Sequence, residues 1–154
     1  MGTRGAVGIR MNGEDKVGYN HFDSYPEGLG NEIVTWLKNT NKEELKYLFN
    51  GIDFESDSDV FDWGEHKMNH NFEEYSGFLG NSLFCEYAYI INLDDDVLEF
   101  YEGFNKNPDA KGRYASLKSD KDTDYYGVKL VQKIPLKDMF TGKYKTDENG
   151  FVKK

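Results

Sequence analysis

The stretch that decides the fold is LFCEYAYIINL, residues 83–93. The apolar side chains at its odd-numbered positions alternate with those at its even-numbered positions, so the two sets would lie on opposite faces of a strand. Its aromatic and β-branched side chains favour an extended conformation. Three aspartates, Asp94, Asp95 and Asp96, follow as a turn, and residues 97–102 return as a second strand. The sequence therefore predicts an antiparallel hairpin whose first strand lies at the centre of a sheet.

Upstream of this hairpin, residues 3–11 alternate between apolar and polar positions, which predicts a half-buried strand. Asn12-Gly13 is typical of a two-residue hairpin turn, so residues 16–22 are expected to form the return strand. Pro26 lacks the backbone donor that a strand ladder needs, so it ends the pairing.

Two helices are predicted next in the chain. The first has one apolar stripe and ends at Asn39-Thr40; the stripe consists of Leu29, Ile33, Trp36 and Leu37. The second begins with a capping-box pattern of Asn41 and Glu44 and ends near Gly51. Its buried face is formed by Leu45, Leu48 and Phe49.

The remaining elements complete the predicted fold. Residues 103–124 are expected to be loop, 126–134 a strand and 135–139 a short helical turn. The fold class is therefore α+β, a mostly antiparallel sheet built from hairpins and covered on one face by two helices in the N-terminal half. We expect one domain, residues 1–154, with a lysine-rich tail, residues 133–154, that either folds against the acidic middle or stays mobile.

Composition restricts the kind of partner. The chain has 154 residues, with 28 Asp and Glu against 19 Lys and Arg and a net charge of -9. Because nucleic-acid binding needs clustered basic residues, we expect no direct nucleic-acid contact and favour a basic protein partner. No segment approaches the ~18 apolar residues of a membrane span. The lone Cys85 excludes an intrachain disulfide, so we expect a cytoplasmic protein.

The acidic middle, residues 53–75, holds eight acidic residues against one lysine. Two interpretations are open: spaced carboxylates around aromatic rings imitate phosphates flanking bases and fill a basic groove, or the segment is a solvated loop. The residues that we expect to bind a basic partner are Asp53, Glu55, Asp57, Asp59, Phe61, Asp62, Trp63, Glu65, Asp94, Asp95 and Asp96.

The densest polar motif is YNHFDSYP, which begins at Tyr19. On a strand His21 and Asp23 share one face, where a carboxylate can orient the imidazole and raise its basicity. Ser24 or Tyr25 would then be a nearby hydroxyl. The alternative is that these side chains satisfy backbone groups where the strand breaks and the helix begins. Both a catalytic or ligand-binding site and a purely structural role are open.

The strings TRG (residues 3–5), YNHFDSYP (19–26) and LG (29–30) resemble the N-terminal signature of a widespread, functionally uncharacterised family of small proteins, many of them phage-encoded. The Tyr-rich hairpin and the late strand ending in Pro135-Leu136 are similar too. The resemblance implies a cytosolic accessory protein of viral type. Small acidic phage proteins often occupy the basic nucleic-acid-binding surface of a host defence enzyme, and the charge of -9 is compatible with this role.

The TRG start also resembles that of N-terminal-nucleophile hydrolases, in which a residue exposed by processing attacks the substrate. Removal of Met1 exposes Gly2, which has no nucleophilic side chain. Thr3 becomes terminal only if a second residue is removed, so the sequence does not favour this mechanism.

Metal sites are weakly indicated. His66 and His70 have a helical ligand spacing, but Lys67 stands where the zinc-protease pattern needs a glutamate. Asp120, Asp122 and Asp124 alternate along the chain as the ligands of a calcium-binding loop do. This segment lacks the glycine and the final glutamate that such a loop requires. We therefore expect no metal or other cofactor, and we expect Cys85 to be a buried, unreactive thiol.

Three hypotheses follow. The first is a non-enzymatic acidic protein that inhibits a basic, nucleic-acid-handling host protein through residues 53–75 and 94–102. The second is a small hydrolase or ligand-binding protein with its site around Tyr19, His21, Asp23 and Tyr25. The third is homo-oligomerisation through the Tyr-rich hairpin, because two helices can hardly cover both of its apolar faces.

Overall fold

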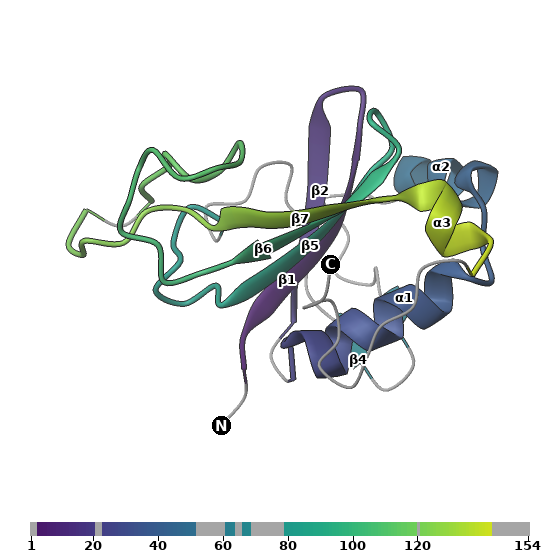
Figure 1. The fold of residues 1–154 in the computed structure, drawn as a ribbon, viewed down its shortest axis with the longest axis horizontal. Helices are drawn as coiled ribbons and strands as arrows, with labels where there is room; N and C mark the ends of the chain where they lie inside the picture. The colour runs from purple at the N-terminus through teal and green to yellow at the C-terminus, as the bar shows by residue number, and fades with distance from the viewer. Residues whose placement is uncertain are drawn as a thin grey trace.

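A computed structural model describes residues 3–20, 23–51, 61–63, 66–68, 79–119 and 121–142, with the backbone alone at residues 19, 51, 61–63 and 66–68. Its main element is a five-stranded sheet in the order β2-β1-β5-β6-β7 (Figure 1). The strands are β1 (Gly5–Met11), β2 (Glu14–Asn20), β5 (Tyr87–Asn92), β6 (Val97–Glu102) and β7 (Lys129–Pro135). The helices are α1 (Asn31–Leu37), α2 (Lys42–Gly51) and α3 (Leu136–Phe140). A separate two-stranded ladder pairs β3 (Phe61–Trp63) with β4 (His66–Met68).

The predicted α+β class is confirmed. Strand β5 lies at the centre of the sheet, as the pattern of residues 83–93 predicted. Among the described strands it forms the one parallel ladder, with β1, while the remaining ladders of both sheets are antiparallel. The sheet is therefore mixed but mostly antiparallel, and α1 and α2 lie in the connection between its two hairpins.

Both predicted hairpins are present. Asn12 (φ 56°) and Gly13 (φ 77°) have the left-handed conformation that a type I′ turn requires, and Met11 pairs with Glu14 across it. The return strand, Glu14–Asn20, begins two residues earlier than predicted, and residues 21 and 22 of the predicted strand lie outside the described residues.

The helices begin as local signals predict, with one difference. The backbone N–H of Glu44 donates to Asn41 Oδ1 at 2.9 Å, which confirms the predicted cap of α2. The Glu44 carboxylate accepts from Thr40 Oγ1 instead of returning to the Asn41 backbone. The first helix was predicted from Leu29, but Pro26–Gly30 forms a π-helical turn before α1.

One face of the sheet packs against the helices. Side chains of β1, β5 and β6 meet those of α1, α2 and α3 in a single buried cluster, which includes Val7, Ile9, Tyr89, Ile91, Leu98, Ile33, Leu37, Leu45 and Met139. Tyr89 and Phe100 stack within this cluster, with ring centroids 5.2 Å apart. This is the helix-covered face that the sequence predicted.

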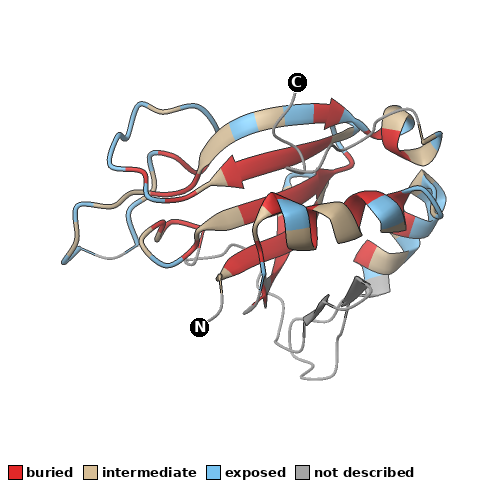
Figure 2. Cartoon of the chain, turned by 60° about the horizontal axis from the view of Figure 1, so that its bottom comes forward, coloured by how far each residue is buried: buried red, intermediate tan, exposed pale blue. Residues whose placement is uncertain are grey.

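The opposite face is also buried, which corrects two predictions. A second cluster joins Ala6, Ala88, Ile90 and Tyr101 of the sheet to loop residues Leu79, Cys85, Tyr114 and Val128. Residues 103–119 and 121–128 project from one end of the sheet (Figures 1 and 2), and Tyr114 and Val128 of this segment pack against this face. The prediction of a half-buried first strand is therefore wrong for Gly5 to Ile9, which are all buried. The premise of the oligomer hypothesis is wrong as well, because both faces of the Tyr-rich hairpin are covered within one chain.

We predict that Gly127→Ala strongly destabilises the fold. A Cβ at this position would overlap the carbonyl oxygen of Tyr114, a backbone atom that cannot move independently of the loop. Urea unfolding should show a loss of at least about 2 kcal/mol in the free energy of unfolding. Ser116→Ala, at an exposed position of the same loop, is the control and should change it by less than about 0.5 kcal/mol. Equal stabilities of the two variants would contradict this account.

Candidate functional site

The turn between β5 and β6 presents three consecutive exposed carboxylates, Asp94, Asp95 and Asp96, here called the acidic turn. Its shape is fixed from below by Asn92, which is completely buried. The backbone N–H groups of Asp94 and Asp95 donate to Asn92 Oδ1 at 3.0 and 3.1 Å. Asp96 has φ 58°, so the chain reverses through a left-handed residue.

Asp94 ties the acidic turn to the turn between β1 and β2. Its carboxylate accepts hydrogen bonds from the backbone N–H groups of Asn12 at 2.7 Å and Gly13 at 2.9 Å. These bonds favour the ionised form and lower the pKa of Asp94. This carboxylate is therefore charged at neutral pH and is engaged within the protein.

The other two aspartates are less engaged. Asp95 Oδ2 accepts from Asn92 Nδ2 at 3.2 Å. Asp96 forms an ion pair with Lys42 of α2 at 2.5 Å, and its backbone carbonyl accepts from Leu136 N at 2.9 Å. Since both members of the Asp96 ion pair are more than a third exposed, the pair contributes at most about 1 kcal/mol. Asp95 and Asp96 are thus the carboxylates of the turn that remain accessible to a partner.

Beneath the turn lies a buried carboxylate, Glu99 of β6, which is 1% exposed. Arg113 donates to both of its oxygens, at 2.7 and 2.9 Å. Asn92 Nδ2 donates at 3.0 Å and the Tyr101 hydroxyl at 2.8 Å. Burial alone would raise the pKa of Glu99, but the Arg113 and Asn92 hydrogen bonds and the Arg113 charge outweigh it and lower the pKa.

A second carboxylate, Asp15 of β2, continues this network. The Tyr114 hydroxyl donates to Asp15 Oδ2 at 2.7 Å and accepts from Arg113 at 2.9 Å. Arg10 donates to Asp15 Oδ1 at 3.0 Å. Burial, reinforced by the nearby Asp15 carboxylate, raises the pKa of Tyr114. The pKa of Tyr101 is likewise raised, by burial and by the Glu99 charge.

A pocket of about 290 Å³ opens beside this network. It lies between the β1–β2 hairpin and the loop after β6, and is lined by Arg10, Gly13, Glu14, Asp15, Arg113, Tyr114 and Leu117. None of these residues was predicted as a site residue from the sequence. One signal was available: Glu99 lies between apolar residues in the segment 97–101, where a buried charge requires a cationic partner.

The motif at residues 19–26 is only partly brought together. Asp23 has φ 55°, is exposed, and accepts a hydrogen bond from the Tyr25 hydroxyl at 3.0 Å. Ser24 is completely buried and is bonded by Asn20 Nδ2 at 2.8 Å, while its carbonyl accepts from the Tyr89 hydroxyl at 2.7 Å. The hydroxyl and the carbonyl of Ser24 are therefore both bonded within the fold. His21 lies outside the described residues, and only the backbone of Tyr19 is described.

The acidic middle is described only at two short strands. Phe61, Asp62 and Trp63 form β3, and His66 opens β4 opposite Trp63. The other predicted residues of this segment lie outside the described residues: Asp53, Glu55, Asp57, Asp59, Glu65 and His70. The same is true of Asp120 and of residues 143–154 in the basic tail.

Other predicted features can be placed. Cys85 is completely buried, and burial raises the pKa of its thiol, as expected for an unreactive cysteine. Within the described ranges, no three His, Cys, Asp or Glu side chains are grouped as metal ligands. The helices described here include none with the length and apolar character of a membrane span.

Comparison of the chain with protein-family models, curated proteins and solved structures gave no match. The resemblance of residues 3–5, 19–26 and 29–30 to a phage-encoded family therefore stays a prediction. The function must be argued from the residues themselves.

We predict that Glu99→Gln destabilises the protein in a pH-dependent way. The substitution leaves the Arg113 charge partly buried without its counter-ion, which should cost about 3 kcal/mol at neutral pH. Because the folded-state pKa of Glu99 is lowered, its stabilising effect is complete above the unfolded value of about 4.3 and is lost as the pH falls through the folded value. The deficit of the variant in urea unfolding should therefore shrink as the pH falls through the folded-state pKa of Glu99.

Glu43→Gln is the matched control for this experiment. Glu43 is 86% exposed and lies 4.0 Å from Lys46, so its removal should leave the free energy of unfolding nearly unchanged at both pH values. A Glu99→Gln deficit that is the same at acid and neutral pH would mean that the ionised form of Glu99 does not stabilise the fold.

Proposed function

We propose that the protein is a non-enzymatic, acidic binding protein that occupies the basic surface of a nucleic-acid-handling partner and so inhibits it. The observation that carries this proposal is the acidic turn, three exposed aspartates of which Asp94 and Asp95 are held by Asn92, Asp94 also by the β1–β2 turn, and Asp96 by Leu136 and Lys42. A fixed row of carboxylates loses little conformational entropy on binding, unlike the same residues in a solvated loop. The acidic residues of the middle segment, from Asp53 to Glu65, are proposed to bind the same partner.

The titration behaviour of the network supports binding over catalysis. A general acid or base works best with a pKa near the operating pH. In the network beneath the turn the pKa values are shifted away from neutral pH: the pKa of Glu99 is lowered, while those of Tyr101 and Tyr114 are raised. These groups keep one protonation state over the neutral range, which suits a scaffold of fixed charges.

The class of partner follows from charge. A chain with a net charge of -9 attracts cationic grooves and repels phosphates, so it would compete with nucleic acid for the same protein surface. The resemblance to phage-encoded proteins points to a host defence enzyme as this partner. Such binding would be electrostatic and therefore weakened by salt.

We predict that the tagged protein captures basic nucleic-acid-binding proteins from a bacterial lysate at roughly 50 mM salt and releases them at roughly 500 mM. The double variant Asp95→Asn/Asp96→Asn should capture several-fold less, because it removes the two accessible charges of the turn. The control is Asp109→Asn, which neutralises an exposed aspartate in the loop after β6. Capture that is insensitive to salt, or equal loss in the control, would contradict the proposed surface.

A second candidate, a small hydrolase or ligand-binding protein, is favoured by the contact between Tyr25 and Asp23 at the surface. The side-chain hydrogen bond to Asp23 and its charge raise the pKa of Tyr25, so this hydroxyl stays protonated. His21→Ala and Asp23→Ala should abolish the biological activity of the protein if this site is functional. Folded variants with full activity in the host would exclude it.

A further inference from the structure

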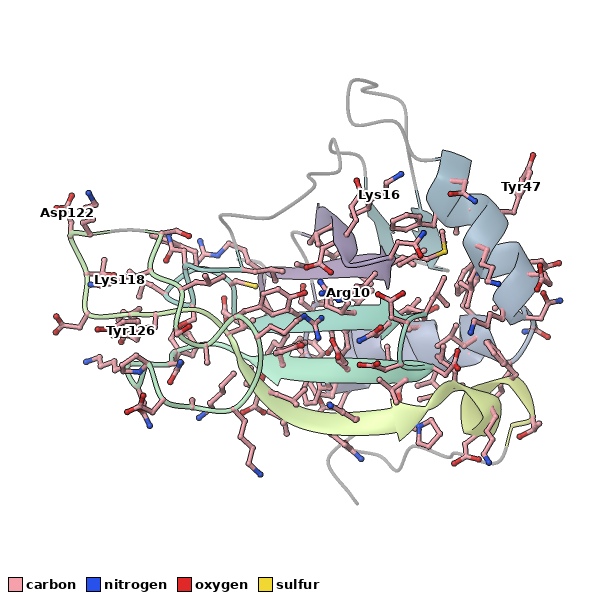
Figure 3. All side chains as sticks on the ribbon, turned by 90° about the horizontal axis from the view of Figure 1, so that it is seen from above. Arg10, Lys16, Tyr47, Lys118, Asp122 and Tyr126 are labelled. Carbon is pink, nitrogen blue, oxygen red and sulfur yellow. The ribbon has the colours of Figure 1, made fainter. Side chains whose placement is uncertain are left out.

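The pocket beside the β1–β2 hairpin is lined by two arginines together with two carboxylates, Glu14 and Asp15. The sequence contains three arginines, and two of them, Arg10 and Arg113, line this one pocket. In Figure 3 Arg10 lies between the loop segment that carries Lys118, Asp122 and Tyr126 and the helix that carries Tyr47. Arginine is the side chain best suited to oxyanions, because its planar fork matches carboxylate and phosphate oxygens.

The two guanidinium groups are held in place. Arg113 is fixed by its paired hydrogen bonds to Glu99 and by the Tyr114 ring, 4.9 Å from its central carbon. Arg10 is fixed by Asp15, which is 5% exposed and bonded in turn to Tyr114. Both arginine side chains nevertheless remain reachable, with exposed fractions of 21% for Arg10 and 29% for Arg113. A ligand would meet preorganised donors and would pay little to order them.

Arg10 has hydrogen-bonding capacity to spare. A guanidinium carries five N–H donors. Within the described residues, Arg10 uses one terminal nitrogen, NH1, on Asp15 Oδ1. Its other donors are directed to no acceptor in the part of the chain that the structure describes.

The charge balance limits the kind of ligand. The positive charges of Arg10 and Arg113 are matched by Asp15 and Glu99, and Glu14 adds a further carboxylate to the lining, so the pocket offers directed donors without excess positive charge. A large polyanion would also be repelled by the acidic turn nearby. The volume of about 290 Å³ is at the lower end of ligand pockets, and Leu117 adds an apolar wall.

We propose that this pocket binds a small molecule bearing one compact oxyanion, a carboxylate or a phosphate, with Arg10 as the main donor and Arg113 as the second. This site borders the proposed protein-binding surface, because Gly13 lines the pocket and its backbone N–H donates to Asp94 of the acidic turn. The oxyanion would accept hydrogen bonds from the unused N–H groups of Arg10, and the rest of the molecule would pack on Leu117.

The test is a titration of the full chain, followed by NMR of its backbone amides at neutral pH and constant ionic strength. The probes are inorganic phosphate, acetate and benzoate, with chloride as the reference anion. Saturable movement of the Gly13 and Leu117 signals, with a Kd of roughly 1 to 10 mM, is expected for at least one probe. Preference for phosphate would assign a phosphate ligand, and preference for benzoate a carboxylate ligand with an apolar part. No saturable movement with any probe, or the same movement with chloride, would overturn the proposal.

Two variants identify the donor. Arg10→Lys keeps the charge and the ion pair with Asp15 but removes the fork, so affinity should fall about tenfold. Arg4→Lys is the matched control, since Arg4 is the one arginine outside the pocket and lies over the Phe84 ring. Unchanged affinity in Arg10→Lys would overturn the proposal.

A further variant, Leu117→Glu, serves if Arg10→Lys does not fold. It places a negative charge on the pocket wall and leaves the hydrogen-bonded network intact, so it should weaken the same probe at least about tenfold. Affinity equal to that of the unaltered chain would likewise overturn the proposal.

Discussion

The carboxylate of Glu99 is the constraint on which the rest of the structure depends. It stands in the middle of the sheet, 1% exposed, where an unpaired charge would cost several kcal/mol. Arg113, 14 residues further along the chain, supplies the counter-ion with two hydrogen bonds. To reach it, the segment after β6 must cross the sheet face that the helices leave open. The ion pair and the second hydrophobic cluster, built on Tyr101, Tyr114 and Val128, therefore form together.

The buried network and the acidic surface are not independent of each other. Asn92 donates to Glu99 from its amide nitrogen and accepts from the Asp94 and Asp95 backbone with its oxygen. One side chain thus connects the buried carboxylate to the shape of the acidic turn. A change that weakens the pairing of Glu99 therefore also weakens the hold of Asn92 on the acidic turn. The conformation of the exposed turn thus depends on the buried network.

The sequence predicted what local signals determine. The alternation of residues 83–93, the Asn12-Gly13 turn and the Asn41 cap each depend on a few neighbouring residues, and all three are confirmed. The covering of the second face depends instead on pairs such as Asp15 and Tyr114, which are 99 residues apart and leave no periodic pattern. The pocket was missed for the same reason, since its arginines come from two distant segments. Glu99, among apolar neighbours, indicated that a cationic partner was needed, but the sequence did not indicate which residue that partner would be.

The way the arginines are used also shapes the outer surface. Arg10 and Arg113 form ion pairs with Asp15 and Glu99, so their charges are neutralised by buried carboxylates. The aspartates of the turn are exposed, and among the described residues Lys42 is the cation that forms an ion pair with one of them, Asp96. The same pairing leaves guanidinium N–H groups unused at the pocket, because neutralising a charge does not occupy all five of its donors. One set of ion pairs can in this way support both an acidic protein-binding surface and a small oxyanion site beside it.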